Sequence, residues 1–472
     1  MTLDDAPPAQ PTRRSRRIAA AGQTAHAPAL GWLDPNDVLA RTQAPTGIDL
    51  ERENEPAPDL LAEARETRAV RPATVIPIAL VLLVVLGYVV TTQLWPLNAI
   101  PPQIAAVQVQ PSAAPAAELA WPKNGSAAVG VEGIGDPVAS SEDPAPIASI
   151  TKLVTTLMVL EELPLAVGEQ GPKYAFTAQD QATYYSYEAG GQSALDVPVG
   201  RTLTQYQMLE GILLGSANNY VDRLAGELWP TDDVFVSAAQ GWLDEHGLDG
   251  ITVVNPSGFS MGNTATPDAL IELAEEALAN PVIAEIVAKK SVKLPGAGKV
   301  TNTNPLLSDR GVVGIKTGAL PVYDTYALLS AKDVKVGDTK VRLHVAVLDQ
   351  KSAKARASAS RKLYRQLQKE VQPTPLVTAG TRAGLVTTAW GERVEAVTTS
   401  DAQVVLWNSA TATATIDVGL SRDAKKGSPV GTLTLTGPLN THTVDLTLAD
   451  DIEGPSPWWR LTHPIELFGL GK

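Results

Sequence analysis

The chain of 472 residues contains no cysteine, which excludes disulfide bonds, zinc–thiolate and iron–sulfur sites, and a cysteine nucleophile. Aromatic residues make up only 5%, whereas 36 prolines and 37 glycines indicate a sizeable share of linker and loop. Basic residues are outnumbered, 38 against 51 acidic ones, and the net charge of −13 argues against nucleic acid as a partner. The length predicts two or three folded units plus extra segments.

One long stretch near the N-terminus carries no charge. It runs from Ala73 to Trp95, and ~20 apolar residues in a helix cross the ~30 Å hydrocarbon core. A buried core helix is disfavoured because the apolar surface runs all round, and a cleaved signal peptide is disfavoured because a long segment precedes the stretch. We therefore expect a single-pass anchor in the cytoplasmic membrane. Three arginines between residues 65 and 71 predict a cytoplasmic N-terminus, with the rest of the chain outside.

Composition and periodicity divide the chain into six segments. The predicted segments are a disordered cytoplasmic tail at 1–72, the transmembrane anchor at 73–95, a Pro/Ala-rich linker at 96–120, a mixed helix-and-strand domain at 121–370, a β-rich domain at 371–455 and an aromatic tail at 456–472. In the mixed domain we expect helices over 153–163, 204–214, 233–245, 266–279 and 352–369, and strands over 127–132, 312–316, 326–331 and 341–348.

The segment after Pro373 has a different pattern. Short runs rich in Val, Thr and Leu predict a small β-sandwich, with strands at 404–407, 413–418, 431–435 and 443–448. The tail that follows contains Trp458, Trp459, Arg460 and Phe468. We expect this tail to pack on the β-domain; an interfacial membrane contact is the alternative.

Three short motifs together point to chemistry: Ser149-Ile150-Thr151-Lys152, Ser216-Ala217-Asn218 and Lys316-Thr317-Gly318. In a helix that starts at Ser149, Lys152 lies one turn on and projects to the same face. A desolvated lysine near a second cation has a lowered pKa and accepts a proton, which activates a serine hydroxyl. None of the five histidines lies in a comparable motif, so a Ser-His-Asp triad is disfavoured.

In their order and separation these motifs resemble those of the serine D-alanyl-D-alanine carboxypeptidases, the low-molecular-mass penicillin-binding proteins. The resemblance covers roughly residues 121–350, with further support from Asn255-Pro256-Ser257-Gly258 and from residues 302–307. It implies a penicillin-binding/β-lactamase-like α/β (α+β) fold, in which helices flank an antiparallel sheet, followed by a β-rich domain. It also implies peptidoglycan stem peptides as substrates, β-lactam antibiotics as covalent inhibitors, and no metal or organic cofactor.

The resemblance further implies a role for each motif residue. Ser149 is the nucleophile, Lys152 its general base, Ser216 a proton relay to the leaving D-alanine, Asn218 a partner of Lys152 and of the substrate amide, Lys316 with Thr317 and Gly318 the binding strand for the terminal carboxylate, and the N–H groups of Ser149 and Ala319 the oxyanion hole. The chain departs from the family pattern at Asn219, where the family has Asp, and at Leu320, where it has Thr. These departures bear on substrate preference and turnover.

Two other functions remain open. A β-lactamase shares the three motifs and adds a Glu-x-x-x-Asn, which Glu276 to Asn280 matches literally. That stretch lies within the predicted helix 266–279 and just before Pro281, which favours a solvated helix face followed by a cap. The second alternative is a non-catalytic peptidoglycan-binding scaffold of the same fold, which the intact motif residues disfavour.

Overall fold

The computed structural model of the chain describes residues 72–420 and 425–470. The predicted cytoplasmic tail and the arginines that predict orientation therefore lie outside the described residues. The first helix, α1, spans Pro72–Leu94. Within the described part of the chain, its segment Ala73–Leu94 is the one stretch of helix long and apolar enough to cross a membrane by length and composition. None of the 18 residues in the most apolar window of that segment is buried in the protein, as expected for a helix whose apolar surface runs all round.

A five-stranded antiparallel sheet organises the mixed domain. Its strands are, in spatial order, β11 (Val312–Leu320), β12 (Thr325–Val336), β13 (Thr339–Gln350), β2 (Ser126–Val131) and β3 (Val138–Ala139). One row of paired residues crosses it from Lys316 through Leu329 and Ala346 to Ala128. The sheet therefore has β11, the strand with Lys316, at one edge.

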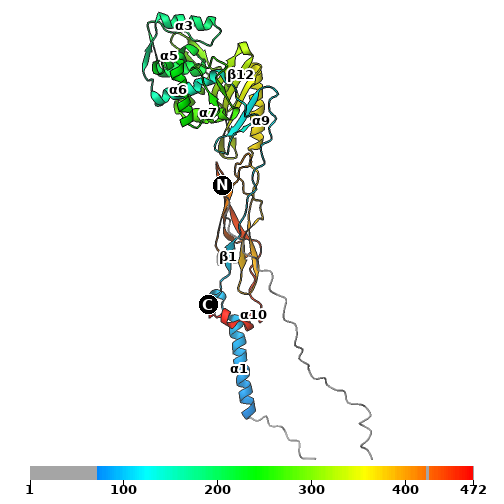
Figure 1. Cartoon of the computed structure of the whole chain (residues 1–472). Coiled ribbons are helices and arrows are strands. Elements are labelled where there is room, and N and C mark those ends of the chain that lie inside the picture. Colours follow the sequence, from blue (N-terminus) through cyan, green and yellow to red (C-terminus); the bar gives the residue numbers. More distant parts are fainter. Residues whose placement is uncertain (1–71, 421–424, 471–472) are drawn as a thin grey trace, which may run out of the picture. The chain divides into compact units, whose positions relative to one another are not determined.

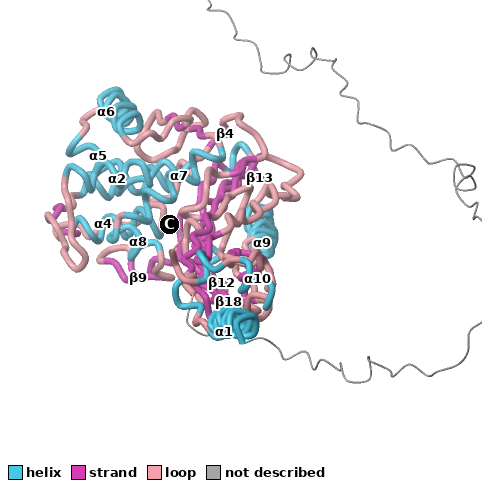
Figure 2. The backbone as a smooth tube through the Cα atoms, turned by 90° about the horizontal axis from the view of Figure 1, so that it is seen from below, coloured by secondary structure: helices cyan, strands magenta, loops and turns pink. Residues whose placement is uncertain are grey.

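Helices cover both faces of this sheet, which confirms the predicted fold class (Figures 1 and 2). One face carries α2 (Thr151–Glu162), α3 (Ala178–Ala189), α4 (Gln205–Leu214), α5 (Asn218–Leu228), α6 (Asp232–Glu245), α7 (Pro267–Ala279) and α8 (Pro281–Val287). The opposite face carries α9 (Ala353–Glu370). Short paired strands complete the helical side: β4 (Ala145–Pro146), β7 (Ile251–Thr252), β8 (Thr264–Ala265), β5 (Lys173–Ala175), β6 (Thr202–Thr204), β9 (Ser291–Leu294) and β10 (Gly298–Thr301).

Helix α2 lies at the centre of the helical side. All its residues from Thr151 to Leu160 are buried: six of the eight residues from Leu153 to Leu160 are apolar, and the Thr155 hydroxyl donates to the Pro256 carbonyl (2.9 Å). Local residues in the sequence determine where the neighbouring helices begin and end. Pro267 occupies the first turn of α7, and Asn280 ends α7 and caps α8 by accepting hydrogen bonds from the N–H groups of Val282 (3.0 Å) and Ile283 (3.2 Å).

The β-rich domain differs from the predicted sandwich. Six strands pair in one continuous antiparallel sheet, in the order β1 (Gln103–Ala106), β14 (Arg382–Thr387), β15 (Arg393–Thr398), β18 (Thr441–Leu448), β17 (Pro429–Thr436) and β16 (Thr413–Val418). The sheet curves on itself: a Cβ placed on Gly384 would lie 3.5 Å from Val418 in β16. The inward side chains are buried by this curvature of a single sheet, so a second sheet is not needed.

The predicted linker is also wrong in part. Gln103 to Ala106 form edge strand β1, with Ile104 opposite Val386 of β14. Beyond this strand, the Ala114 N–H donates to the Ala410 carbonyl (3.0 Å). Without β1, the edge of β14 would have unpaired backbone N–H and C=O groups. Residues 103–106 contain no proline, so they can form hydrogen bonds with these groups. Prolines outside that segment obscured the strand in the sequence.

Residues 404–407 form no strand, although their β-branched and aromatic character predicts one. They run as irregular chain with all four side chains buried. Val405 and Trp407 pack in the core beneath α9, whereas Val404 and Leu406 pack in the core of the β-domain. Burial on both sides requires apolar side chains at every position, and that pattern resembles a strand in the sequence.

The aromatic tail forms two short helices, α10 (Pro457–Thr462) and α11 (Pro464–Leu467). The Trp459 ring meets Trp390 of the β-domain edge-on at 6.2 Å, as the packing prediction requires. The tail also holds the end of α1: Arg460 donates to the Trp95 carbonyl (2.9 Å), and the Trp95 and Phe468 rings lie 4.7 Å apart.

Candidate active site

Ser149 lies at the start of the buried helix α2. It sits in a single 3₁₀ turn, η3 (Ala148–Ile150), that runs directly into the helix. Ala148 and Ile150 are buried, whereas Ser149 keeps partial exposure. Ala148 has φ of +50°, in the left-handed region that non-glycine residues rarely adopt. The chain thus turns sharply just before the serine and keeps it accessible.

Lys152, one helical turn later, has its amine directed at Ser149. Its Nζ donates hydrogen bonds to Ser149 Oγ (2.9 Å), Asn218 Oδ1 (2.6 Å) and the Ser257 carbonyl (2.5 Å). The last two oxygens only accept. A neutral Lys152 keeps two N–H bonds for these acceptors, so its lone pair is left facing the Ser149 hydroxyl. Of the three groups around this amine, Ser149 is the one that carries a hydroxyl proton.

Burial makes that neutral form accessible. Lys152 is completely buried, and desolvation lowers the pKa of its amine from 10.5 to about 7, although the nearby Asp222 carboxylate acts in the opposite direction. The pKa of Asp222 is raised in turn, to about 6, chiefly by burial. A lysine with a pKa near 7 is a base that functions at neutral pH.

A second amine and a second hydroxyl form the opposite half of the site. Lys316 on β11 is buried, and its Nζ donates to Ser216 Oγ (2.8 Å) and to the Thr317 carbonyl (3.1 Å). Ser216 has φ of +60°, a strained conformation that ends helix α4 and precedes α5. Burial lowers the pKa of Lys316 well below its ordinary value, and the positive charges of Lys152 and Arg356 lower it further.

Two glycines let neighbouring backbone approach the turn that leads to Ser149. A Cβ on Gly318 would lie 2.2 Å from the Ile147 carbonyl oxygen, and a Cβ on Gly258 would lie 2.1 Å from that of Ala148. Both distances are far shorter than a van der Waals contact. The third residue of the Lys-Thr-Gly motif is therefore glycine because strand β11 packs against the backbone that leads to Ser149.

Buried polar contacts hold β11 in this position. Arg356 of α9 donates to the carbonyls of Gly318 (2.6 Å) and Ala327 (3.0 Å), which ties the strand to β12 and to the helix behind it. The Thr317 and Thr303 hydroxyls share a hydrogen bond of 2.7 Å. The motif strand is thus held by groups from three separate elements.

The structure brings the predicted residues together in two sets. Ser149, Lys152 and Asn218 meet at one amine, and Ser216, Lys316 and Thr317 meet at the other. Gly318 joins the sets by its close approach to the turn before Ser149. Ala319 follows on the same strand and is partly exposed; its role in an oxyanion hole stays a prediction.

The two departures from the family pattern both have structural roles. Asn219 accepts from the Leu195 N–H (3.0 Å) and donates to the Leu195 carbonyl (2.8 Å). An ionised aspartate accepts only, so the amide holds this loop with one bond more than a carboxylate makes. Leu320 is buried at the end of β11, where it contributes to packing.

Comparison with known proteins agrees with this geometry. Residues 138–352 match the family model of the D-alanyl-D-alanine carboxypeptidases, peptidase family S11. The D-alanyl-D-alanine carboxypeptidase DacB2 of Mycobacterium tuberculosis is 31% identical over 180 residues, which cover 37% of this chain and 57% of the relative. The chain thus matches little more than half the length of that relative.

Two solved structures are matched over nearly their whole length. The Streptomyces K15 DD-transpeptidase is 22% identical, with a TM-score of 0.45, over 52% of this chain and 98% of that one. The carboxypeptidase DacD from Francisella tularensis is 18% identical, with a TM-score of 0.47, over 74% of this chain and 96% of that one.

Three residues that contribute to this site were not predicted from the sequence. Ser257 contributes a backbone carbonyl, which no side-chain motif reveals, although it lies in the quoted stretch Asn255-Pro256-Ser257-Gly258. Arg356 lies in the predicted helix 352–369, where nothing in the sequence marks it as buried, yet its side chain is buried. Asp222 lies four residues after Asn218, and this spacing on helix α5 was the available signal that both face the same way.

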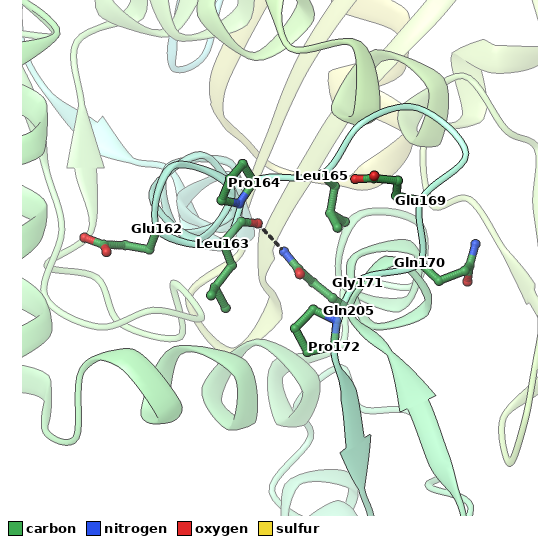
Figure 3. Close-up of a pocket in the computed structure, with 9 residues that line it drawn as sticks. All are labelled: Glu162, Leu163, Pro164, Leu165, Glu169, Gln170, Gly171, Pro172 and Gln205. Atoms are coloured by element: carbon green, nitrogen blue, oxygen red, sulfur yellow. Dashed lines mark hydrogen bonds between the residues drawn. The ribbon is translucent and has the colours of Figure 1, made fainter.

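A cavity elsewhere in this domain is lined by none of the motif residues. Its volume is about 500 Å³, and it lies between Glu162 to Leu165 and the start of α4 at Gln205 (Figure 3). Glu162 is the last residue of α2, so the length of the helix separates this cavity from Lys152 by ~15 Å. Gln205 uses its amide to donate to the Leu163 carbonyl (2.7 Å), which closes the end of α2.

The close approach of β11 to Ile147 generates a stability prediction. Gly318→Ala forces a methyl group against a backbone carbonyl, so we expect a loss of about 1–3 kcal/mol in the free energy of unfolding. Gly241→Ala is the matched control, because Gly241 lies in α6 with no atom within 4 Å of the added Cβ. That control should be neutral or stabilising by up to about 1 kcal/mol. Denaturant unfolding of the purified full chain in detergent measures both, and equal stability of the two variants contradicts the contact.

Proposed function

We propose that this chain is a membrane-anchored serine D-alanyl-D-alanine carboxypeptidase that removes the terminal D-alanine from peptidoglycan stem peptides through an acyl-enzyme on Ser149. The observation that carries the proposal is the hydrogen bonding of Lys152. Asn218 and Ser257 occupy the two N–H bonds of the neutral amine and direct its lone pair at Ser149. The family match of residues 138–352 supports the same reaction.

Acylation begins when Lys152 takes the Ser149 proton as Oγ attacks the carbonyl of the penultimate D-alanine. The attack forms the C–O bond and places a negative charge on the carbonyl oxygen. The N–H groups of Ser149 and Ala319 are the proposed donors to that oxygen, as in an oxyanion hole. Collapse of the tetrahedral intermediate breaks the peptide C–N bond and leaves the shortened peptide as an ester on Ser149.

Lys316, Thr317 and Ser216, the second half of the site, are proposed to bind the leaving D-alanine and to protonate its amine. Lys316 and Thr317 are proposed to bind its carboxylate, and a bound anion restores the charged form of Lys316 that burial disfavours. Ser216 accepts a hydrogen bond from Lys316, so its own hydroxyl proton is free to pass to the departing amine. The proton that Lys152 took from Ser149 replaces the one that Ser216 gives up, so Lys152 is neutral again. Water then attacks the ester with Lys152 as base, and the proton that Lys152 takes from this water passes to Ser149 Oγ as the ester C–O bond breaks, which releases the product and regenerates Ser149.

Placement outside the cytoplasmic membrane is part of the proposal. Its support is the apolar segment Ala73–Leu94 together with the arginines that precede it in the sequence. The substrate class fits this placement, because peptidoglycan stem peptides lie outside that membrane. β-Lactam antibiotics are proposed as covalent inhibitors that acylate the same serine.

The alternative of a β-lactamase has less support. Asn280 of the Glu-x-x-x-Asn stretch uses its carbonyl oxygen to cap α8, so that side chain already has a structural role. The scaffold alternative requires no base, yet Lys152 is buried, with its amine bonded to the Ser149 hydroxyl. Incubation with a labelled penicillin distinguishes the three functions. A lactamase would hydrolyse the penicillin ester on Ser149 rapidly, whereas the proposed enzyme would do so slowly or not at all. A scaffold would not become labelled.

The proposal predicts the product of a donor pentapeptide. Incubation with the full chain should release one alanine, detected by mass spectrometry, and Ser149→Ala should lower that rate by roughly 10⁴-fold or more. Ser358→Ala, which changes an exposed serine on α9, is the matched control and should retain full activity. Crosslinked products would point to transpeptidation as the main reaction, and an unchanged peptide would overturn the proposal.

The pH dependence of Ser149 acylation gives a second prediction. Only neutral Lys152 accepts a proton, and burial lowers its pKa to about 7. The rate of labelling by a fluorescent penicillin should therefore rise about tenfold per pH unit below 7 and level off above it. A rate that keeps rising to pH 9 or beyond would mean that Lys152 keeps an ordinary lysine pKa and would contradict the role given to burial.

A further inference from the structure

The hairpin loop that follows the motif strand exposes two apolar side chains. Leu320 at the end of β11 pairs with Thr325 at the start of β12, so residues 321–324 form the loop between them. Val322 is 86% exposed and Tyr323 is 61% exposed. Among the large apolar side chains that the structure describes outside α1 and the C-terminal tail, these two have the largest exposed fractions, and they are consecutive. Neither side chain is part of the core, so packing does not explain the pair.

Local contacts define the conformation of this loop. Pro321 begins a 3₁₀ turn, η5 (Pro321–Tyr323), and the Asp324 N–H donates to the Pro321 carbonyl (3.1 Å). Asp324 has φ of +49°, in the left-handed region, and the chain then enters β12. Turns of this kind are usually built from polar residues and glycine. The turn itself therefore does not require two apolar side chains at its surface.

The proposed reaction fixes the direction in which a substrate lies along β11. Lys316 and Thr317 are the proposed partners of the terminal carboxylate, and the Ala319 N–H is a proposed donor to the reacting carbonyl oxygen. The substrate chain therefore runs antiparallel to the strand, with its C-terminus at Thr317 and its earlier residues beyond Ala319. β11 is the edge strand of its sheet, the position at which an extended peptide can add to a sheet.

The lengths of the two chains bring an earlier part of the substrate to the loop. Consecutive Cα atoms are ~3.8 Å apart, so the Val322 Cα lies within ~11 Å of the Ala319 Cα. In the substrate, the residue before the two D-alanines has its Cα one such step from the residue whose carbonyl reacts, and a side chain of four carbons adds ~5 Å. A long side chain at this substrate position has the length to reach the apolar pair, whereas glycine does not.

We propose that the loop of residues 321–324 is a specificity site for the substrate residue that precedes the two D-alanines, and that Val322 and Tyr323 cover the aliphatic part of its side chain. The site selects peptides with a long aliphatic side chain at that position. A polar group at the end of such a side chain can extend past the loop into solvent. The inference rests on the proposed function and deepens it, because it concerns which stem peptides the same active site accepts.

The test compares two acetylated tripeptides on the full chain in detergent. One is acetyl-norleucyl-D-alanyl-D-alanine, whose first residue has a butyl side chain, and the other is acetyl-glycyl-D-alanyl-D-alanine. The measured quantity is the ratio of their kcat/KM values for release of the terminal D-alanine. The unchanged protein should favour norleucine by roughly tenfold or more, because the butyl group loses contact with water on the loop. Val322→Ser combined with Tyr323→Ser should reduce this preference at least about fivefold.

Two control variants isolate the apolar contact. Val167→Ser is the matched control, because Val167 is also exposed, at 59%, but lies in the turn after α2, beyond the end of that helix remote from Lys152. It should leave the ratio unchanged. Tyr323→Phe keeps the ring and removes the hydroxyl, so it should keep the preference too. All these positions are exposed, and the substitutions should therefore change the free energy of unfolding little.

Three results overturn the inference while the proposed function stands. Equal slowing of both peptides in the double variant keeps the ratio and indicates a structural effect on the strand. A preference lost as fully in Tyr323→Phe or Val167→Ser as in the double variant contradicts an apolar contact at the loop. Equal kcat/KM values for the two peptides in the unchanged protein show that no such selection exists.

Failure of the proposed function gives a different result. The unchanged protein would then release D-alanine from neither peptide and would not be labelled at Ser149 by a fluorescent penicillin. That outcome contradicts the carboxypeptidase reaction, and the inference about its specificity would be overturned with it.

Discussion

The catalytic half of the chain depends on how one buried amine is bonded. Lys152 has no contact with bulk water, so each of its N–H bonds needs a protein acceptor, and the three acceptors come from three separate parts of the fold. Helix α2 supplies the amine, the start of α5 supplies Asn218, and the loop before β8 supplies the Ser257 carbonyl. Burial lowers the proton affinity of the amine, and the acceptors decide in which direction its lone pair points.

Strained backbone conformations and close backbone packing also position the groups of the site. The left-handed conformations of Ala148 and Ser216 place two hydroxyl-bearing turns beside the two amines. The turn at Ala148 is supported from behind: Gly258 and Gly318 let their backbone come within the space that a side chain would fill. Such conformations cost free energy, and the surrounding contacts must supply it. The site is thus rigid for the same reasons that make it locally unfavourable.

The sequence was informative where side-chain identity decides the structure. The order of Ser149, Lys152, Ser216 and Lys316 predicted which groups meet, and proline and capping signals predicted helices such as α7 to within a residue. It was uninformative where the backbone makes the contact, as at the Ser257 carbonyl, or where pairing is distant. Strand β1 has four residues, and its partner lies more than 270 positions later, so no local pattern could reveal it. The strand prediction for residues 404–407 was wrong for the opposite reason: side chains buried on both sides give the same apolar sequence pattern as a buried strand.

The pairing of β1 with β14 makes the catalytic domain an insertion. Residues 103–106 complete a sheet whose other strands begin at Arg382, so the polypeptide leaves the β-domain, builds the whole catalytic domain and returns to the same sheet. The catalytic domain is consequently tethered at both ends. A protease that cuts one of the two connections to the β-domain leaves the other intact, so release of the catalytic domain from the β-domain takes two cuts.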